Sequence, residues 1–445
     1  MSKPVEQFVN ALHAGDVARV RTLLEGHEEV RASVNAPLSY FDSRPVARAT
    51  KNLPLLDLLL SYGADLNLKS AWWAGGFGLL EIGITPEEAA PLIARGATVD
   101  VFAAAHLGMF DRLRELIDAD PSLVHARGGD GKTPLHCART VEIARFLIDR
   151  GAGIDVRDVD HESTSVQYLV HDAPDVARLL ISRGAWFDIF AAIGLRDSAL
   201  VKRSLAEDPQ ALEHRIGQGK YQVAHNGTKP ATPEEIADRR GDVYRWVFAA
   251  NISALEAAAR FGNEEILGLL RALATPAQRL LAACANADRA TAEAIVASQP
   301  GLVASLSSEE MRVLADKASD SNTAAVKLML DLDFDQRAPG HDRGDALHWA
   351  AFHGNTEMLR ALLQHLGAPI GVRDGHYGGT PLHWCIHGAV QGWAKDRGGD
   401  YPVTARLLIE AGETVEPSMA STGRQDLDAV LREHMRMPPA SSGES

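Results

Sequence analysis

The stretch GKTPLHCARTVEIARFLIDRGAGIDVRD, Gly131 to Asp158, decides the fold. It opens with Thr133 and a proline, a pattern typical of a helix start, because the threonine hydroxyl caps the first turn and proline has no N–H to lose there. Its second half places apolar residues at helical spacing and ends in a Gly-Ala pair, in which glycine tolerates positive φ. The stretch therefore predicts two short helices, a turn and a loop.

The same phrase returns later in the chain. GGTPLHWCIHG, Gly378 to Gly388, opens a comparable unit, and RGDALHWAAFHGNTEMLRALLQHLGAPIGVRD, from Arg343 to Asp374, keeps the pattern with Asp and Ala in place of Thr and Pro. Weaker copies of the second helix begin at Leu55, Ala89 and Val176. One helical hairpin cannot bury its apolar face alone, but stacked hairpins can. The sequence thus predicts a helical repeat array.

With a period of about 33 residues, the chain resembles the ankyrin-repeat family. The resemblance runs from about Val5 to Met437 and is strongest in the units that open near Gly131, Gly344 and Gly379. It implies an all-α solenoid of about 13 stacked helix-turn-helix units, curved with a concave groove. A narrower likeness, carried by SAWWAGGFG and GGTPLHWCIHG, is to a bacterial group of ankyrin-repeat proteins of unassigned role. It suggests a bacterial source and supplies no activity.

Four segments organise the expected array. We expect an N-terminal ankyrin array at 4–216, an inserted loop at 217–231, a C-terminal array at 232–437 and a disordered tail at 438–445, where PPASSGES is small and polar. The segment 217–231 is polar, Gly-rich and too long for a standard connection, so it is either a lid over a groove or an idle surface loop.

Composition excludes several classes of partner and location. The 445 residues carry 45 basic and 59 acidic side chains, a net charge of -14 that repels nucleic acid and anionic membranes. The three cysteines are odd in number and far apart, which favours a reducing compartment. Neither a secretory signal nor a membrane-spanning stretch is evident. We therefore expect a soluble, cytoplasmic protein that binds neither nucleic acid nor membrane.

The histidines of the repeat phrase first suggest a metal site. His383 and His387 are four residues apart, a spacing that puts two imidazoles on one helical face. In the family, however, the histidine of TPLH turns back to the threonine and the loop. We therefore interpret five residues as structural caps: Thr133, His136, His348, Thr380 and His383. Because no third ligand lies at suitable spacing, we expect no metal and no cofactor.

Candidate binding residues come from the departures from the repeat phrase. The resemblance places the end of each first helix on the concave face, where this chain has His106, His171, Asp172, Arg239, Arg260, Phe352, His353 and His387, with Trp384 as apolar support. Such residues are favoured recognition anchors, although a solvated face with incidental histidines is the alternative. Within WWAGGFG, the large side chains of Trp72, Trp73 and Phe77 either cradle a ligand or plug a gap.

Enzyme signatures are missing from the sequence. It contains no G-x-S-x-G, no dinucleotide-binding fingerprint and no H-E-x-x-H, so we predict no catalytic residue. We expect a non-catalytic recognition scaffold that binds a protein partner through its concave face and loop tips. The alternative is a small-molecule-binding protein, or an atypical hydrolase or lyase, with a pocket lined by His, Asp and Arg in the groove. A closed pocket favours the alternative and an open face favours the scaffold.

Overall fold

The computed structural model describes residues 2–38, 42–81, 83–261, 263–340, 343–365, 369–395 and 397–435. In these ranges the chain consists of helices and loops, and strand-like pairing is limited to an isolated antiparallel bridge between Arg157 and Thr164. The predicted all-α repeat fold is confirmed. The number of about 13 units and the concave curvature stay predictions. The predicted disordered tail, 438–445, lies outside the described residues.

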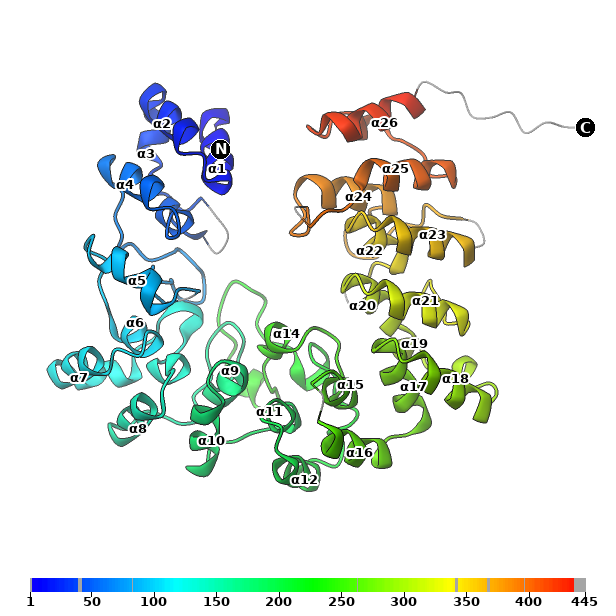
Figure 1. Cartoon of the computed structure of the whole chain (residues 1–445), viewed down its shortest axis with the longest axis horizontal. Coiled ribbons are helices and arrows are strands. Elements are labelled where there is room, and N and C mark those ends of the chain that lie inside the picture. The colour runs from blue at the N-terminus through cyan, green and yellow to red at the C-terminus, as the bar shows by residue number, and fades with distance from the viewer. Residues whose placement is uncertain are drawn as a thin grey trace, which may run out of the picture. The chain divides into compact units, whose positions relative to one another are not determined.

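The chain divides into two compact units, Met1–Ile252 and Ser253–Ser445. The helices of unit 1 (Figure 1) are α1 (Lys3–Ala14), α2 (Val17–Gly26), α3 (Glu28–Ala32), η2 (Pro45–Arg48), α4 (Leu53–Ser61), α5 (Pro86–Ile93), α6 (Val101–His106), α7 (Phe110–Ala119), η3 (Pro121–His125), η4 (Gly129–Gly131), η5 (Pro134–Cys137), α8 (Val141–Asp149), α9 (Ser165–Asp172), α10 (Pro174–Ser182), α11 (Ile189–Gly194), α12 (Ser198–Glu207), η6 (Gly219–Tyr221), α13 (Pro233–Ile236) and α14 (Tyr244–Val247).

The helices of unit 2 are α15 (Ala254–Arg260), α16 (Glu264–Leu273), α17 (Pro276–Ala285), α18 (Arg289–Ser298), η7 (Val303–Ser305), α19 (Ser308–Met311), α20 (Val313–Ser319), α21 (Thr323–Asp331), α22 (Ala346–Phe352), α23 (Thr356–His365), α24 (Pro381–Val390), α25 (Tyr401–Glu410), η8 (Pro417–Ala420) and α26 (Gln425–Met435). The segment 217–231 belongs to unit 1. The predicted arrays at 4–216 and 232–437 stay predictions.

The hairpin of α9 and α10 shows how the sequence makes a repeat. Thr164 caps α9, and its backbone N–H donates to the Gln167 side chain at 2.9 Å, so the two residues form a capping box. After α10 the chain turns at Gly184, whose φ of 93° suits glycine. The N–H of Ala185 then donates to the Leu180 carbonyl at 3.0 Å and closes the helix end. The two helices pack side by side.

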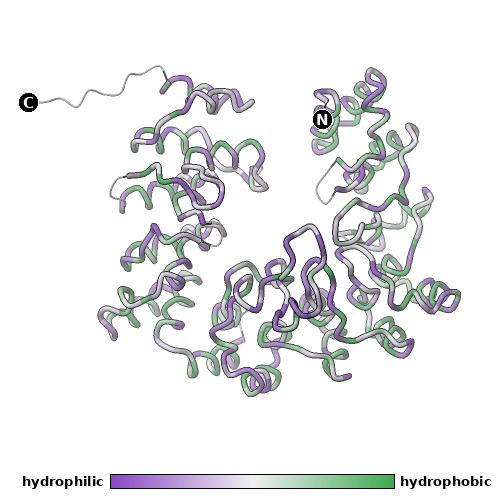
Figure 2. Tube along the Cα trace, turned by 180° about the vertical axis from the view of Figure 1, so that it is seen from behind, coloured by the Kyte–Doolittle hydropathy of each residue, from purple (hydrophilic) through white to green (hydrophobic). Residues whose placement is uncertain are grey.

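Neighbouring hairpins share a continuous core. In unit 2, Leu347 of α22, Leu359 of α23 and Leu382 of α24 are at most 1% exposed, and α22 packs against both α20 and α24. Burying each such leucine contributes roughly 1.5–3 kcal/mol. Hydrophobic and hydrophilic residues alternate along the helices of each unit, as expected for helices with one buried face (Figure 2). No helix in the described ranges combines the length and the apolar content needed to span a membrane.

In two of the three strong repeats, a histidine ties the repeat to the next one. Nδ1 of His136 lies 2.9 Å from Thr133 Oγ1, and its Nε2 lies 3.2 Å from the carbonyl oxygen of Ser163 in the following repeat. Burial lowers the pKa of His136 to about 3, so the ring is neutral and its Nε2–H donates. His348 repeats the arrangement, with Nε2 at 3.2 Å from the Gly379 carbonyl. We call each contact an inter-repeat latch.

The third histidine of this type differs on its far side. Nδ1 of His383 lies 3.0 Å from Thr380 Oγ1, as in the other repeats. Its Nε2 faces the carboxylate of Glu416 at 3.8 Å in place of a backbone carbonyl. The ring is also more exposed than the other two, with 31% of its side chain accessible. His383 therefore keeps the contact with the capping threonine but does not form the inter-repeat latch.

Candidate functional site

Polar side chains recur at one position of three consecutive repeats in unit 1. His106 ends α6, Arg139 follows η5, and Asp172 ends α9. Successive members are 33 residues apart, which is one repeat. We call these three residues the polar ladder. Arg139 was missed by sequence reasoning, because the first helix of its repeat is reduced to the short 3-10 turn η5.

Hydrogen bonds join the polar ladder across the repeats. Nε of Arg139 donates to His106 Nδ1 at 3.4 Å, and Nη1 pairs with the Asp172 carboxylate at 2.7 Å. Nε2 of His106 lies 3.1 Å from the Ile84 carbonyl oxygen. Burial and the charge of Arg139 lower the pKa of His106, so its neutral ring accepts at Nδ1 and donates at Nε2. Half of the Asp172 side chain, 50%, stays exposed.

A cleft of about 400 Å³ opens beside the polar ladder. All three ladder residues line it, together with Lys51, Glu88, Lys132, Cys137 and Tyr168 among others. Lys51 pairs with Glu88 at 2.9 Å, and Arg139 pairs with Asp172, so charges of both signs alternate around the opening. The cleft thus offers hydrogen-bond donors and acceptors, and no single sign of charge dominates it.

Segments that depart from the repeat phrase meet elsewhere in unit 1. The ring of Trp73, from the segment 72–78, lies 4.7 Å from the ring of His225 in the segment 217–231, between centroids. The backbone N–H of His225 donates to the buried carboxylate of Glu162 at 3.1 Å. The middle of 217–231 is therefore held against the loop that precedes α9.

Phe77 and Lys132 pack at the same place. Phe77 is 8% exposed, and a methyl group placed on Gly129 would overlap its ring. The ammonium of Lys132 lies 5.1 Å from the centroid of that ring and 3.4 Å from Asp130 Oδ2. The aromatic side chain predicted to cradle a ligand or plug a gap is therefore packed against the glycine-rich turn η4.

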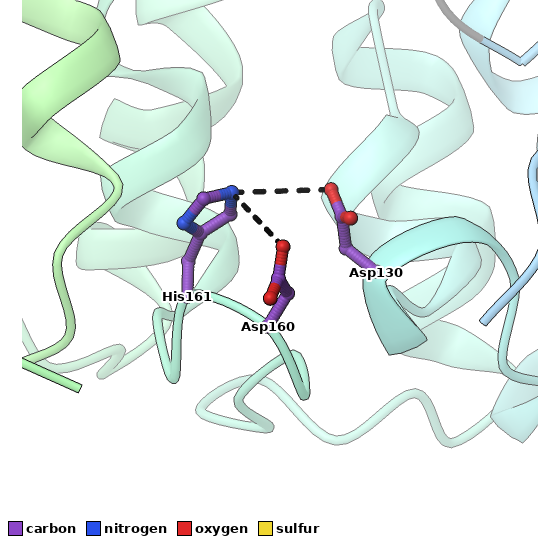
Figure 3. Close-up of side chains that lie close together, drawn as sticks. All are labelled: Asp130, Asp160 and His161. Carbon is purple, nitrogen blue, oxygen red and sulfur yellow. Dashed lines mark ion pairs between the residues drawn. The ribbon is translucent and has the colours of Figure 1, made fainter. Parts of the chain in front are cut away.

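Asp130, Asp160 and His161 come together where these segments meet, and we call them the carboxylate-imidazole cluster (Figure 3). Nε2 of His161 lies 4.0 Å from Asp130 Oδ2 and 3.9 Å from Asp160 Oδ2. Both separations are longer than a hydrogen bond. On the other side of the ring, Nδ1 lies 2.9 Å from Asp242 Oδ1. Asp242 therefore orients the ring, and Nε2 faces two carboxylates.

The electrostatics of the cluster follow from burial among acidic groups. Burial alone would lower the pKa of His161, but the hydrogen bond with Asp242 and the charges of Asp158 and Asp130 raise it to about 9. Burial raises the pKa of Asp158 to about 6, against the opposing effects of His161 and of its hydrogen bonds. Burial likewise raises the pKa of Asp160. The cluster is therefore a partly buried acidic centre that favours positive charge.

In unit 2 the predicted residues gather around Phe352. Phe352 and Trp384 are buried with their ring centroids 6.2 Å apart, and His353 is also buried, with Nε2 2.8 Å from a carbonyl of the preceding repeat. His387 is exposed, and its ring lies 6.1 Å from that of Phe352. Trp393, which is 59% exposed, lies 5.5 Å from the same ring. Only the edge of this aromatic group is accessible to a partner.

The other predicted residues lie apart from one another. His171 is exposed beside the polar ladder, and Arg260 is exposed at the end of α15. Nη1 of Arg239 donates to the carbonyl of Gly219 at 2.6 Å, inside the segment 217–231. Their roles in binding stay predictions.

The carboxylate-imidazole cluster was not predicted from the sequence. Asp160 and His161 are adjacent and could have drawn notice, but their partner Asp130 is in the preceding repeat. The orienting Asp242 is 81 residues from His161. No local spacing rule connects these positions.

Two family models match the chain. One described as "Ankyrin repeats (3 copies)" matches residues 313–392, and one described as "Ankyrin repeat" matches residues 130–159. The second match contains Asp130 and ends one residue before Asp160.

Two curated proteins are similar to parts of the chain. The Ankyrin repeat and SAM domain-containing protein 6 of Rattus norvegicus is 25% identical over 165 residues, which are 33% of this chain and 19% of that protein. The protein of the same name from Mus musculus is 31% identical over 90 residues, which are 19% of this chain and 10% of that protein. The matched region thus spans less than a fifth of the length of either relative.

Proposed function

We propose that this chain, which belongs to the ankyrin-repeat family, is a protein-interaction scaffold that binds a protein partner through the face of the polar ladder and through exposed loop tips. The observation that carries the proposal is the ladder itself. Repeat proteins build binding surfaces by placing variable side chains at one position of successive repeats, so that each repeat adds contact area without a new core.

The ladder has the chemistry of a recognition surface. Arg139 is a planar donor whose side chain is 30% exposed, and its acidic partner Asp172 is 50% exposed. Arginine is enriched among the residues that dominate interface energies, since it combines apolar area with several donors. A partner that covers the Arg139–Asp172 pair would exclude water from it, and the alternating charges around the cleft would select a complementary pattern.

Large aromatic side chains support a role for the loop tips. In unit 2, Tyr377 is 72% exposed and Trp393 is 59% exposed, in the loops on either side of α24. Tryptophan and tyrosine are favoured at interfaces because they bury much area with few rotatable bonds. Tyr377 stands in the loop that precedes α24, so it is suited to contact a partner that reaches beyond the helices.

Affinity capture with matched variants tests the proposal. The full-length wild type, an R139A/D172A variant and an R145A/D175A control are used to capture proteins from the native cytosol, with quantification by mass spectrometry. Arg145 on α8 and Asp175 on α10 are exposed members of second helices, so the control removes the same charges from another face.

We expect the wild type and the control to capture one shared set of proteins. The captured amount of these proteins should fall about tenfold with R139A/D172A, which corresponds to a loss of about 1.4 kcal/mol of binding free energy. Equal capture by all three proteins contradicts a role for the ladder. No specific capture, together with a metabolite that raises the melting temperature of the wild type but not of R139A/D172A, favours the small-molecule alternative.

A further inference from the structure

We propose that Asp130, Asp160 and His161 bind a divalent transition-metal ion of the Zn²⁺ class. One potential ligand atom from each residue lies within 4.8 Å of the others. Ligands on one Zn²⁺ ion lie roughly 3.3 Å apart, given bonds of about 2.0 Å in a tetrahedron. The separations of 4.0 Å and 3.9 Å from His161 Nε2 to the two carboxylates exceed this by less than 1 Å. The two carboxylate oxygens lie at most 4.8 Å apart, so binding requires the side chains to rotate toward the ion by up to about 1.5 Å.

A buried oxygen atom points independently to a missing donor. Asp130 is 5% exposed, and its side chain points toward His161 and Asp160 (Figure 3). Its Oδ2 faces His161 and Lys132, whereas its buried Oδ1 has no hydrogen-bond partner among the described residues. A buried carboxylate oxygen without a partner is destabilising by about 1–3 kcal/mol or more. A cation bound by both carboxylate oxygens, or a turn of the carboxylate that brings Oδ1 to the ion, would satisfy it.

The orientation of His161 is the one that metal-binding histidines have. A metal-ligating histidine donates its second ring N–H to a carboxylate or carbonyl, which fixes the tautomer and aims the other nitrogen at the metal. Here Nδ1 meets Asp242 at 2.9 Å, and Nε2 is directed at Asp130 and Asp160. Asp242 is therefore a positioning residue and not a ligand.

The charge around the cluster matches a divalent cation. Four carboxylates surround the His161 ring: Asp130, Asp158, Asp160 and Asp242. A lysine and an arginine pair with them, Lys132 with Asp130 at 3.4 Å and Arg245 with Asp242 at 3.5 Å. Nε2 of the His225 ring also lies 3.8 Å from Asp160 Oδ1. The carboxylates thus outnumber the lysine and arginine side chains that pair with them by two. A divalent ion offsets an excess of this size.

The ligand types select the metal. One imidazole nitrogen with two carboxylates suits Zn²⁺, whereas Ca²⁺ prefers six to eight oxygen ligands. Three protein ligands leave at least one coordination position for water or for a group from a partner. Because Asp130 and Asp160 come from loops of adjacent repeats, the ion would also cross-link those repeats.

Calorimetric titration of the untagged full chain tests the site. Chelator-treated protein is titrated with ZnCl₂ at about pH 8, where the ion must displace the proton that the acidic surroundings favour on His161. We expect one Zn²⁺ per chain, little response to CaCl₂, and a visible absorption band with Co²⁺ as a spectroscopic substitute. D160N and H161Q should each weaken Zn²⁺ binding by at least tenfold, and D242N by about 10–100-fold through loss of ring orientation.

Two further variants separate the site from other effects. H125Q and D175N remove an exposed histidine and an exposed carboxylate elsewhere in unit 1, and they should bind Zn²⁺ as the wild type does. If D160N or H161Q does not fold, D130N is the substitute, because asparagine is isosteric and tolerates the φ of 57° at this position. Absence of Zn²⁺ binding up to about 1 mM, or equal binding by all variants, would overturn the proposal.

Discussion

Replacing Asp374 by asparagine should lower the free energy of unfolding of unit 2 by about 2.6 kcal/mol at neutral pH. The carboxylate sits in the loop before α24 and accepts four hydrogen bonds. Its donors are the backbone N–H groups of His376 at 2.8 Å, Tyr377 at 2.5 Å and Gly379 at 2.7 Å, and Nε1 of Trp384 at 3.0 Å. Burial works to raise the pKa of Asp374, but these hydrogen bonds lower it to about 2.

The magnitude and the pH dependence follow from that pKa. Relative to an unfolded value of about 3.9, the carboxylate stabilises the fold by roughly 1.4 kcal/mol per unit of difference. Because the folded pKa is depressed, the contribution is fully present above the unfolded pKa and is lost as the pH falls through 2. About half of it remains near pH 3. Asparagine keeps one acceptor oxygen but loses the charge and presents an NH₂ group to the same donors.

Urea unfolding monitored by tryptophan fluorescence and near-UV circular dichroism measures the effect at pH 7 and near pH 3. The control is D333N, because Asp333 is an exposed residue of unit 2 with a φ of 62° that asparagine also tolerates, so its loss should be near zero. The reasoning is refuted if D374N loses less than about 0.5 kcal/mol at pH 7, the usual range for surface substitutions, or if its deficit is unchanged near pH 3.

Three other predictions concern packing, thiols and the latch. G388A should destabilise unit 2 by about 1–3 kcal/mol, because a Cβ there would overlap the Phe352 carbonyl. The control G268A has open space around it in α16 and should be neutral or stabilising by up to about 1 kcal/mol. Thermal unfolding of the two variants measures the difference. A thiol reagent at about pH 8 should label no cysteine until urea unfolds the chain. Burial raises the pKa of all three thiols, to about 11 in Cys137 and about 12 in Cys284. Labelling of the folded chain would contradict this prediction. H348A should cost about 1–3 kcal/mol by leaving a buried carbonyl unpaired, and a loss below about 0.5 kcal/mol in urea unfolding would remove the latch as a stabilising contact.

The repeat fold was predictable because its signals are local. The capping threonine, the proline after it, the helical spacing and the closing glycine all lie within one stretch, as in Gly131 to Asp158. The match at 313–392 contains two of the three units in which the phrase is best preserved, those that open near Gly344 and Gly379. The placement of His136 and His348 between repeats also follows from the phrase, since each occupies the third position of its first helix.

The candidate site was predictable only in part, because it depends on contacts between distant segments. The ladder contains His106 and Asp172 from the sequence prediction, but the residue that joins them, Arg139, follows a first helix too short to set the register. In unit 2, Phe352 and His353 occupy the expected helix end and are nonetheless buried, because α24 and the segment after it pack over them. A spacing rule places a residue on a face but does not reveal what covers that face.

The inter-repeat latch gives the array a direction. His136 and His348 each donate forward, to a carbonyl of the repeat that follows in the chain. Shortening the array from its front therefore leaves a carbonyl at the new edge, which water satisfies readily. Removing repeats from the C-terminal end removes the carbonyl acceptor and leaves the Nε2–H of a buried histidine without a hydrogen-bond partner. Shortened versions of this protein should tolerate the loss of leading repeats better than the loss of trailing ones.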